Sequence, residues 1–198
     1  MKKAVLCVAF AGLAGHASAA NFYLDFQGFP TAVASGDTFE FQVTASADVG
    51  THILGGGFGL RTTRSDVVSN VTWTPANWSA FNEDIDGYDG NGNYGQVVFG
   101  QLLLPIPGFD VPAAGSELGS AIGTFQVQLS GWPGFGFEDQ WQLIEGVPFT
   151  LDVYDVDTHE IFNSSDGNLY LNGVLVPSPS GLALLGFCGM VTGRRRRD

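Results

Sequence analysis

Phe39-Glu40-Phe41-Gln42-Val43-Thr44-Ala45 is the stretch that decides the fold of this chain. Apolar and polar side chains alternate along it, which places Phe39, Phe41 and Val43 on one face. Successive side chains of an extended strand point to opposite sides, so this period of two predicts a β-strand with one buried and one solvated face. The same alternation recurs in residues 22–27, 125–129 and 149–153.

Further strands and the turns between them complete an all-β pattern. Short apolar runs at residues 97–99 and 102–104 predict a strand that is buried on both sides or carries a bulge at Gly100. Residues 58–61, 67–73 and 168–176 are additional strand candidates, and frequent glycine and proline turns separate them all. We therefore expect a two-sheet antiparallel β-sandwich of the jelly-roll type over residues 20–176.

The N-terminal segment has the layout of an export signal. Lys2 and Lys3 precede an apolar run over residues 4–14, and the small residues Ala17 and Ala19 flank Ser18. A charged start, a short apolar stretch and small residues at the cleavage site are typical of a secretory signal peptide. We expect a signal helix within residues 1–19, with the mature chain beginning at Ala20.

The C-terminal segment combines a proline break, an apolar run and a basic cluster. Val176, Pro177, Ser178 and Pro179 precede the apolar residues 180–193, which Arg194, Arg195, Arg196 and Arg197 follow. As a helix, the apolar run would be about 21 Å long. A bilayer core is about 30 Å thick, so the segment spans it only marginally, and the arginines would stay on the cytoplasmic side.

This tail resembles the PEP-CTERM sorting signal of exported bacterial proteins, which has a Pro-x-Pro motif, a short transmembrane helix and an arginine cluster. The resemblance covers residues 176–198 and implies cleavage by an exosortase-type enzyme and association with the cell surface or extracellular polysaccharide. Ser178 stands where the signal usually has Glu. An ordinary C-terminal membrane anchor is the alternative. The predicted division is a signal peptide at 1–19, an ectodomain at 20–176 and a sorting signal at 177–198.

The ectodomain is strongly acidic and contains no cysteine. Residues 20–176 hold nineteen carboxylates and only two cations, Arg61 and Arg64, for a net charge near −17. Nucleic acids and anionic membrane surfaces would repel such a domain, whereas calcium and neutral glycans would not. Cys7 and Cys188 lie in the two terminal segments. The ectodomain must therefore be stable outside the cell without a disulfide.

A second resemblance concerns the ectodomain itself. Residues 33–43, with Gly36-Asp37-Thr38 before a strand, and the later Gly57-Phe58-Gly59-Leu60 look like the opening of cohesin-like domains. Residues 118–127 are similar to a late strand of that fold. The resemblance covers residues 22–156 and implies a jelly-roll sandwich related to carbohydrate-binding modules, some of which hold calcium.

Residues 83–93 form the clearest candidate for a metal site. Asp84, Asp86, Asp89 and Asn91 place oxygen ligands on a glycine-rich loop, and calcium takes six to eight oxygens. The spacing fails as an EF-hand, because Tyr94 takes the glycine position and Gly100 takes the place of the closing Glu. The two interpretations are a calcium site and a solvated loop whose Asp, Asn and Gly residues make turns.

Aromatic residues next to turns are candidates for contact with a glycan, because flat rings stack on sugars. Trp78 and Phe81 adjoin the acidic loop, and Trp132 and Phe135 lie in a glycine-broken turn. Trp73 lies on a β-branched run and is assigned to the core. A second acidic run at residues 152–160 is interpreted as a strand with Asp152 and Tyr154 pointing outward, followed by a turn.

Catalytic motifs are missing from the sequence. It contains no Gly-x-Ser-x-Gly elbow, no His-Glu-x-x-His and no phosphate-binding loop. We therefore expect a non-enzymatic, exported protein of the cell surface or extracellular matrix. The alternatives are a calcium-assisted carbohydrate-binding module and, second, a glycan-active enzyme with two carboxylates.

Overall fold

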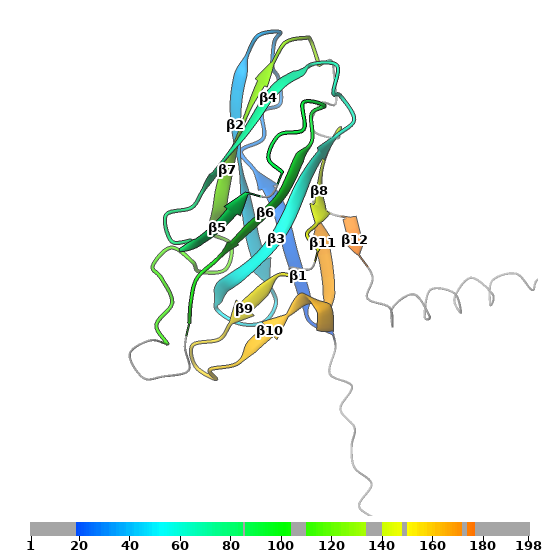
Figure 1. Cartoon of the computed structure of the whole chain (residues 1–198). Helices are drawn as coiled ribbons and strands as arrows, with labels where there is room; N and C mark the ends of the chain where they lie inside the picture. The colour runs from blue at the N-terminus through cyan, green and yellow to red at the C-terminus, as the bar shows by residue number, and fades with distance from the viewer. Residues whose placement is uncertain are drawn as a thin grey trace, which may run out of the picture.

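The computed structural model of this chain describes residues 19–84, 86–103, 110–133, 140–147, 150–171 and 174–176. These residues form two six-stranded β-sheets that pack face to face (Figure 1). The expectation of an all-β, two-sheet sandwich is confirmed. The predicted signal helix and C-terminal helix lie outside the described residues, and no helix within them is both long enough and apolar enough to cross a membrane.

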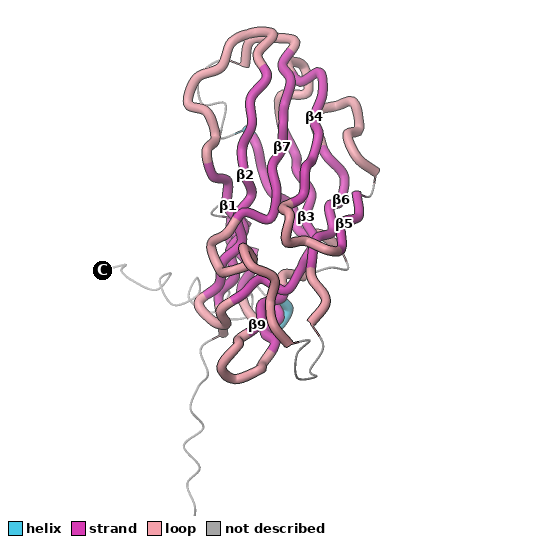
Figure 2. The backbone as a smooth tube through the Cα atoms, turned by 90° about the vertical axis from the view of Figure 1, so that its left-hand side faces the viewer, coloured by secondary structure: helices cyan, strands magenta, loops and turns pink. Residues whose placement is uncertain are grey.

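Sheet A has the strand order β12-β11-β1-β2-β7-β4. Its strands are β1 (Asn21–Gln27), β2 (Thr38–Ala47), β4 (Val68–Pro75), β7 (Ala121–Leu129), β11 (Asn168–Leu171) and β12 (Val174–Val176). Figure 2 shows β1, β2, β7 and β4 side by side. All pairs are antiparallel except β1 with β11, which is parallel.

Sheet B has the order β10-β9-β3-β6-β5, and β8 also pairs with β3. Its strands are β3 (His52–Thr62), β5 (Phe81–Asp84), β6 (Tyr94–Gly100), β8 (Trp141–Glu145), β9 (Asp152–Tyr154) and β10 (Ile161–Asn163). One turn of 3-10 helix, Ser164–Asp166, follows β10. The long β3 has room for β9 and β8 one after the other along the same edge, while β6 occupies the opposite edge.

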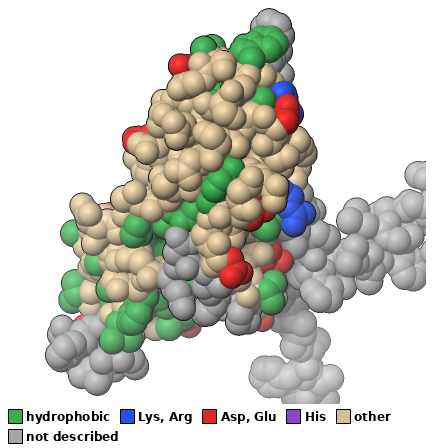
Figure 3. Space-filling model, turned by 45° about the horizontal axis from the view of Figure 1, so that its top comes forward, with side chains coloured by type: hydrophobic (Ala, Val, Ile, Leu, Met, Phe, Trp, Pro, Cys, Tyr) green, Lys and Arg blue, Asp and Glu red, His purple; other side chains and the backbone are tan. Residues whose placement is uncertain are grey.

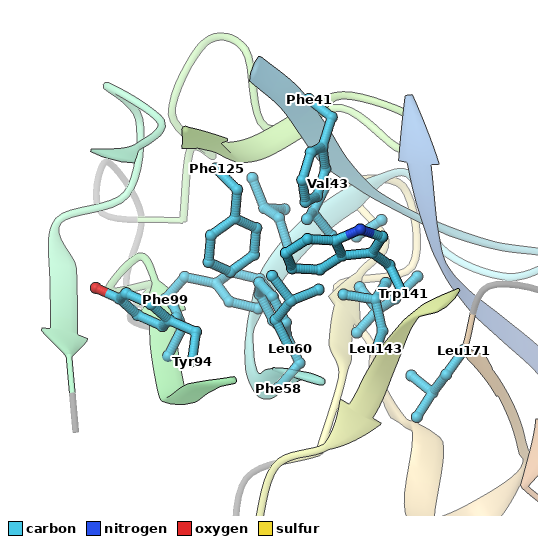
Figure 4. Packing of buried hydrophobic residues seen from close by; sticks show 14 of the residues in the cluster. Phe41, Val43, Phe58, Leu60, Tyr94, Phe99, Phe125, Trp141, Leu143 and Leu171 are labelled. Carbon is cyan, nitrogen blue, oxygen red and sulfur yellow. The ribbon is translucent and has the colours of Figure 1, made fainter. Parts of the chain in front are cut away.

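The core is built from the apolar half of each alternating strand. In β2, Phe41 and Val43 are almost completely buried, while Glu40 and Gln42, on either side of Phe41, are exposed. Phe41 packs against Phe125 of β7 with ring centroids 5.5 Å apart and against Trp141 of sheet B at 6.1 Å (Figure 4). Each such buried side chain contributes about 1.5–3 kcal/mol to stability. Contacts of this kind hold the sheets together without a disulfide.

Both ends of the ectodomain lie next to each other in sheet A. Phe22 of β1 is opposite Leu169 of β11, and Leu169 is opposite Val176 of β12. The carbonyl of Ala20 accepts a hydrogen bond of 2.9 Å from the amide of Asn168. Adjacent strands are about 4.8 Å apart, and β11 lies between β1 and β12. The predicted signal peptide and the predicted sorting signal would therefore join the sandwich within about 10 Å of each other.

Candidate functional site

The outer face of sheet A is a flat array of polar side chains, here called the polar face. Its side chains come from the outward half of the alternating strands β1, β2, β4, β7 and β11. They are Tyr23, Asp25, Gln27, Thr38, Glu40, Gln42, Thr44, Asn70, Thr72, Thr74, Thr124, Gln126, Gln128 and Tyr170. None of these described side chains is a cation, and most of them are neutral amides or hydroxyls.

Strand register aligns these side chains in rows across the sheet. One row runs through Gln27, Gln42, Thr124 and Thr74, which pair in turn across β1, β2, β7 and β4. Directly opposite side chains in such pairs are close enough to act on one ligand. A hollow of about 390 Å³ lies along the row and is lined by Gln27, Gln42 and Thr124 together with Gly28, Glu40 and Phe41.

The next row adds a carboxylate that is already engaged. Glu40, Gln126 and Thr72 pair across β2, β7 and β4. The side-chain amide of Gln126 donates a hydrogen bond of 2.8 Å to Glu40 Oε1. Because amides and hydroxyls both donate and accept hydrogen bonds, the rows match a ligand whose own hydroxyls do the same.

Two stacked tyrosines lie on β1 and β11 at one end of the polar face. Tyr23 and Tyr170 lie directly opposite each other on β1 and β11, and their rings stack with centroids 5.1 Å apart and planes 17° apart. The next outward residue of β1 is Asp25. Desolvation by its neighbours raises the pKa of the Asp25 carboxyl above its ordinary value. The sequence singled out neither tyrosine, because their pairing joins two segments that are far apart in the chain.

The outer face of sheet B differs from the polar face, because it carries a groove that is lined mostly by apolar side chains and glycines. Figure 3 shows hydrophobic side chains in several patches on the side turned to the viewer, with the basic side chains near the right-hand edge of the molecule. A groove of about 330 Å³ is lined by residues in and next to β5, β6, β3 and β9. Its lining is Leu54, Gly55, Gly56, Phe81, Val98, Phe99, Gly100, Gln101, Thr150 and Asp152.

Two glycines let the backbones of β3 and β6 approach closely at this groove. Gly55 lies directly opposite Gly100. A Cβ atom on Gly55 would lie 2.9 Å from the carbonyl oxygen of Phe99, and one on Gly100 would lie 3.2 Å from that of Leu54. A side chain at Gly55 would force the backbone of β6 to shift and one at Gly100 would be tightly packed, and main-chain atoms without side chains make up this part of the groove.

Among the described side chains that line the groove, Asp152 is the one that carries a charge. It is partly buried, and its Oδ1 accepts hydrogen bonds from the Asn163 amide and, at 3.4 Å, from the Thr150 hydroxyl. Desolvation raises the pKa of the Asp152 carboxyl above its ordinary value, although the Thr150 hydrogen bond partly opposes this. The outward position of Asp152 confirms the interpretation of the second acidic run.

Tyr154 of the same run alternates with the core residue Val153, as Asp152 does, but it is only 5 % exposed and is therefore covered rather than solvated. Its hydroxyl is 2.8 Å from His159 Nδ1, which lies beyond the turn that follows β9. The carboxylate of Asp155 accepts hydrogen bonds from the amides of Asp157 and Thr158 and so closes that turn.

The predicted calcium loop is organised around Asp89. Its Oδ1 accepts hydrogen bonds from the amides of Asn91 at 2.6 Å and Asn93 at 3.1 Å, and its Oδ2 accepts one of 2.8 Å from the Asn93 side chain. Partial desolvation raises the pKa of Asp89, but these hydrogen bonds outweigh it and hold the pKa below its ordinary value. Asp86 is exposed with a positive φ of 71°, and Asp84 ends β5.

Calcium at this loop stays a prediction. Within the described ranges, no three His, Cys, Asp or Glu side chains form a group that could hold a metal ion. The hydrogen bonds of Asp89 give the loop a self-contained structure of the Asx-turn kind. The amide oxygen of Asn93, which accepts from the amide of Thr62 at 3.3 Å, connects the loop to β3.

The structure separates the four aromatic residues that were predicted to contact a glycan. Trp78 is only 8 % exposed, and its indole N–H donates a hydrogen bond of 3.0 Å to the carbonyl of Ala121. Its assignment to a surface contact is wrong, because the ring fills the core beside Phe99. Phe81 and Trp132 are 52 % and 61 % exposed, whereas Phe135 lies outside the described residues.

Phe81 and Trp132 belong to different parts of the molecule. Phe81 begins β5 and lines the groove of sheet B. Trp132 follows β7, and its carbonyl accepts a hydrogen bond of 3.4 Å from the guanidinium of Arg64, which also donates to the carbonyl of Pro133. Arg64 is in turn paired with Asp66 at 2.9 Å.

Comparison with known proteins assigns no family. No family model and no curated protein matches this chain. Among solved structures, a chain of the CaDoc0917–CaCohA2 complex is similar with 12% identity and a TM-score of 0.41, over 72% of this chain and 91% of its own. A chain of the Coh-OlpC–Doc435 complex, described as a novel type I cohesin–dockerin complex from Clostridium thermocellum, is similar with 10% identity and a TM-score of 0.36, over 71% of this chain and 84% of its own.

The raised pKa of Asp152 leads to a prediction about stability. A carboxyl whose pKa is higher in the folded state binds its proton more tightly there, so stability falls as pH rises from the ordinary Asp value to the raised one. We expect Asp152→Asn to raise the melting temperature at neutral pH and to have no effect in strong acid. Thermal melts at both pH values test this, with Asp157→Asn as an exposed control for charge loss. A lower melting temperature of Asp152→Asn at neutral pH would contradict it.

The loop of Asp89 leads to a second prediction. In chelator, Asp89→Ala should lower the free energy of unfolding by about 1 kcal/mol, because three hydrogen bonds lose their acceptor. Asn91→Ala is the matched control, since its backbone amide stays in place. If calcium binds, the wild-type melting temperature also rises in calcium, and neither variant shows the full rise. Identical wild-type melts in calcium and in chelator would rule the calcium site out.

Proposed function

We propose that this chain is an exported, non-enzymatic module of the cell surface or extracellular matrix that binds polysaccharide through the polar face of sheet A. The row of Gln27, Gln42, Thr124 and Thr74 carries the proposal. A neutral polysaccharide presents a line of hydroxyl groups, and this row presents a line of groups that donate to and accept from hydroxyls. The hollow along the row gives such a chain a place to lie.

Charge supports the same partner. Residues 20–176 have a net charge near −17. Two of the carboxylates that this charge includes, Asp25 and Glu40, lie on the polar face, which has no cation among its described side chains. An anionic polymer would be repelled at long range, whereas a neutral one is not. A matrix protein and a dedicated carbohydrate-binding module would both use this face, and they would differ in how selective it is for one sugar.

Export and sorting are part of the proposal. The predicted motif Pro177-Ser178-Pro179 begins directly after β12, whose last residue is Val176. An exosortase-type enzyme that removes the arginine cluster would leave the sandwich intact, because the cluster lies well beyond the last strand. The protein would then pass from a transient membrane anchor to the envelope or the extracellular space.

Processing at both ends can be read from the mass of the protein. The intact mass of the protein recovered from its host envelope should correspond to a chain that begins at Ala20 and lacks Arg194 through Arg197. Replacing the four arginines by serines should leave a longer C-terminus, because the enzyme loses its recognition element. A mature protein that still ends at Asp198 would contradict the sorting proposal and favour an ordinary anchor.

Binding to polysaccharide should depend on the central row of the polar face. We expect the exported protein to co-sediment with extracellular polysaccharide of its host, and the double variant Gln42→Ala and Thr124→Ala to bind about tenfold more weakly. Two lost hydrogen bonds of about 0.7 kcal/mol each account for such a loss. Gln142→Ala removes an exposed amide from sheet B and is the control. Equal binding by all three proteins would contradict the proposed face.

A further inference from the structure

We propose a second binding site, in the groove on the outer face of sheet B, for a hexosamine unit with a free, protonated amine in a cationic polysaccharide. Phe81 would pack on the sugar ring and Asp152 would pair with the ammonium group. The site adds to the proposed function, on which it rests for the polymer class of its ligand. It lies on the opposite side of the sandwich from the polar face, because the two sheets turn their outer faces away from each other.

The apolar wall of the groove suits the ring of a sugar. Phe81 begins the edge strand β5 and leaves 52 % of its surface exposed, so its ring is accessible to a ligand. Leu54 and Val98 extend the apolar lining along β3 and β6. The C–H groups of a pyranose pack well on a flat aromatic ring, and a cation nearby is attracted to the face of that ring.

The charged part of the groove suits an amine rather than a hydroxyl. Asp152 is partly buried, so its carboxylate has lost some of the water that would stabilise its charge. Its Oδ1 takes part in hydrogen bonds to Asn163 and Thr150, which fix the position of the carboxylate. An ammonium ion close to the carboxylate would compensate the lost solvation, and the pKa of Asp152 would fall on binding.

The amide of Gln101, another polar side chain of the groove, already has hydrogen-bond partners within the protein. Gln101 lines the groove, but its amide nitrogen donates to the carbonyl of Ile53 at 2.6 Å and to Ser116 Oγ at 2.9 Å. Its amide oxygen accepts from the amide of Ala113 at 2.7 Å. Gln101 therefore supports the loop behind the groove, and recognition of the ligand falls to Asp152 and Thr150.

Charge complementarity identifies the polymer class. Nineteen carboxylates against two arginines give the ectodomain a field that concentrates cations at its surface. A partly deacetylated polysaccharide carries such cations at regular intervals, so it gains from the long-range field as well as from the groove. With a neutral chain on the polar face and a cationic chain in the groove, one molecule would bridge two polymers.

The experiment compares two soluble probes, a glucosamine hexamer and its fully N-acetylated counterpart, by calorimetry with the exported protein. We expect the hexamer with free amines to bind at least tenfold more tightly. Asp152→Asn and Phe81→Ala should each weaken its binding about tenfold, and Asp157→Asn, which removes an exposed carboxylate beyond β9, should not. Asp152→Asn is expected to be at least as stable as the wild type, so its loss of binding would not arise from unfolding.

The outcomes separate this site from the proposed function. If Asp152→Asn and Asp157→Asn weakened binding of the glucosamine hexamer equally, its amines would respond only to the net charge of the protein, and the proposed site would be overturned. Equal binding of the two hexamers would overturn it as well. If host polysaccharide still binds and the loss in Gln42→Ala with Thr124→Ala persists, the polar face stands while the groove fails. If the wild-type protein bound neither the host polysaccharide nor either hexamer, both the polar face and the groove would be overturned as binding sites.

Discussion

The contact between the two sheets is the constraint on which the rest of this structure depends. An ectodomain without cysteine can hold its sheets together only by burying apolar surface, and Phe41, Phe125 and Trp141 sit where sheet A meets sheet B. In a strand, each residue that enters the core forces its neighbours to the outside. The polar face is therefore the obligatory counterpart of the core. Packing between the sheets constrains the inward residues, whereas the chemistry of the outward residues is free to vary.

That choice differs between the sheets. In sheet A many outward positions carry Gln and Thr in register, whereas the groove of sheet B is lined by Leu54, Val98 and glycines. A solvated face needs only polarity, and Lys and Glu would serve it as well as Gln. The near-absence of cations from residues 20–176 and the row of neutral Gln and Thr side chains in sheet A are more specific than solubility requires. This difference supports assigning separate ligands to the two faces.

Local alternation predicted the strands well, because it reports directly which side chains are buried. Phe39, Phe41 and Val43 share the inner face of β2 as expected, and Asp152 points outward from β9. Sequence could not show that β1 pairs in parallel with β11, since that contact joins the two ends of the ectodomain. Trp78 illustrates the same limit. Its polar surroundings in the sequence indicated the surface, but the carbonyl of Ala121, which accepts its N–H, comes from a distant strand.

Neither the row on sheet A nor the groove on sheet B could be predicted from the sequence, because strand pairing brings their residues together from distant parts of the chain. Gln42 and Thr124 become neighbours only through strand pairing, and Phe81 and Asp152, on β5 and β9, line one groove only because β6 and β3 lie between them in the same sheet. Stacked sheets are about 10 Å apart, so ligands on the two outer faces would be separated by little more than the thickness of the sandwich. If both proposed sites bind, such a rigid spacer would hold two polymer chains at a fixed, short distance. Cross-linking of this kind needs no catalysis and no movement, only a core stable enough to keep both faces in place.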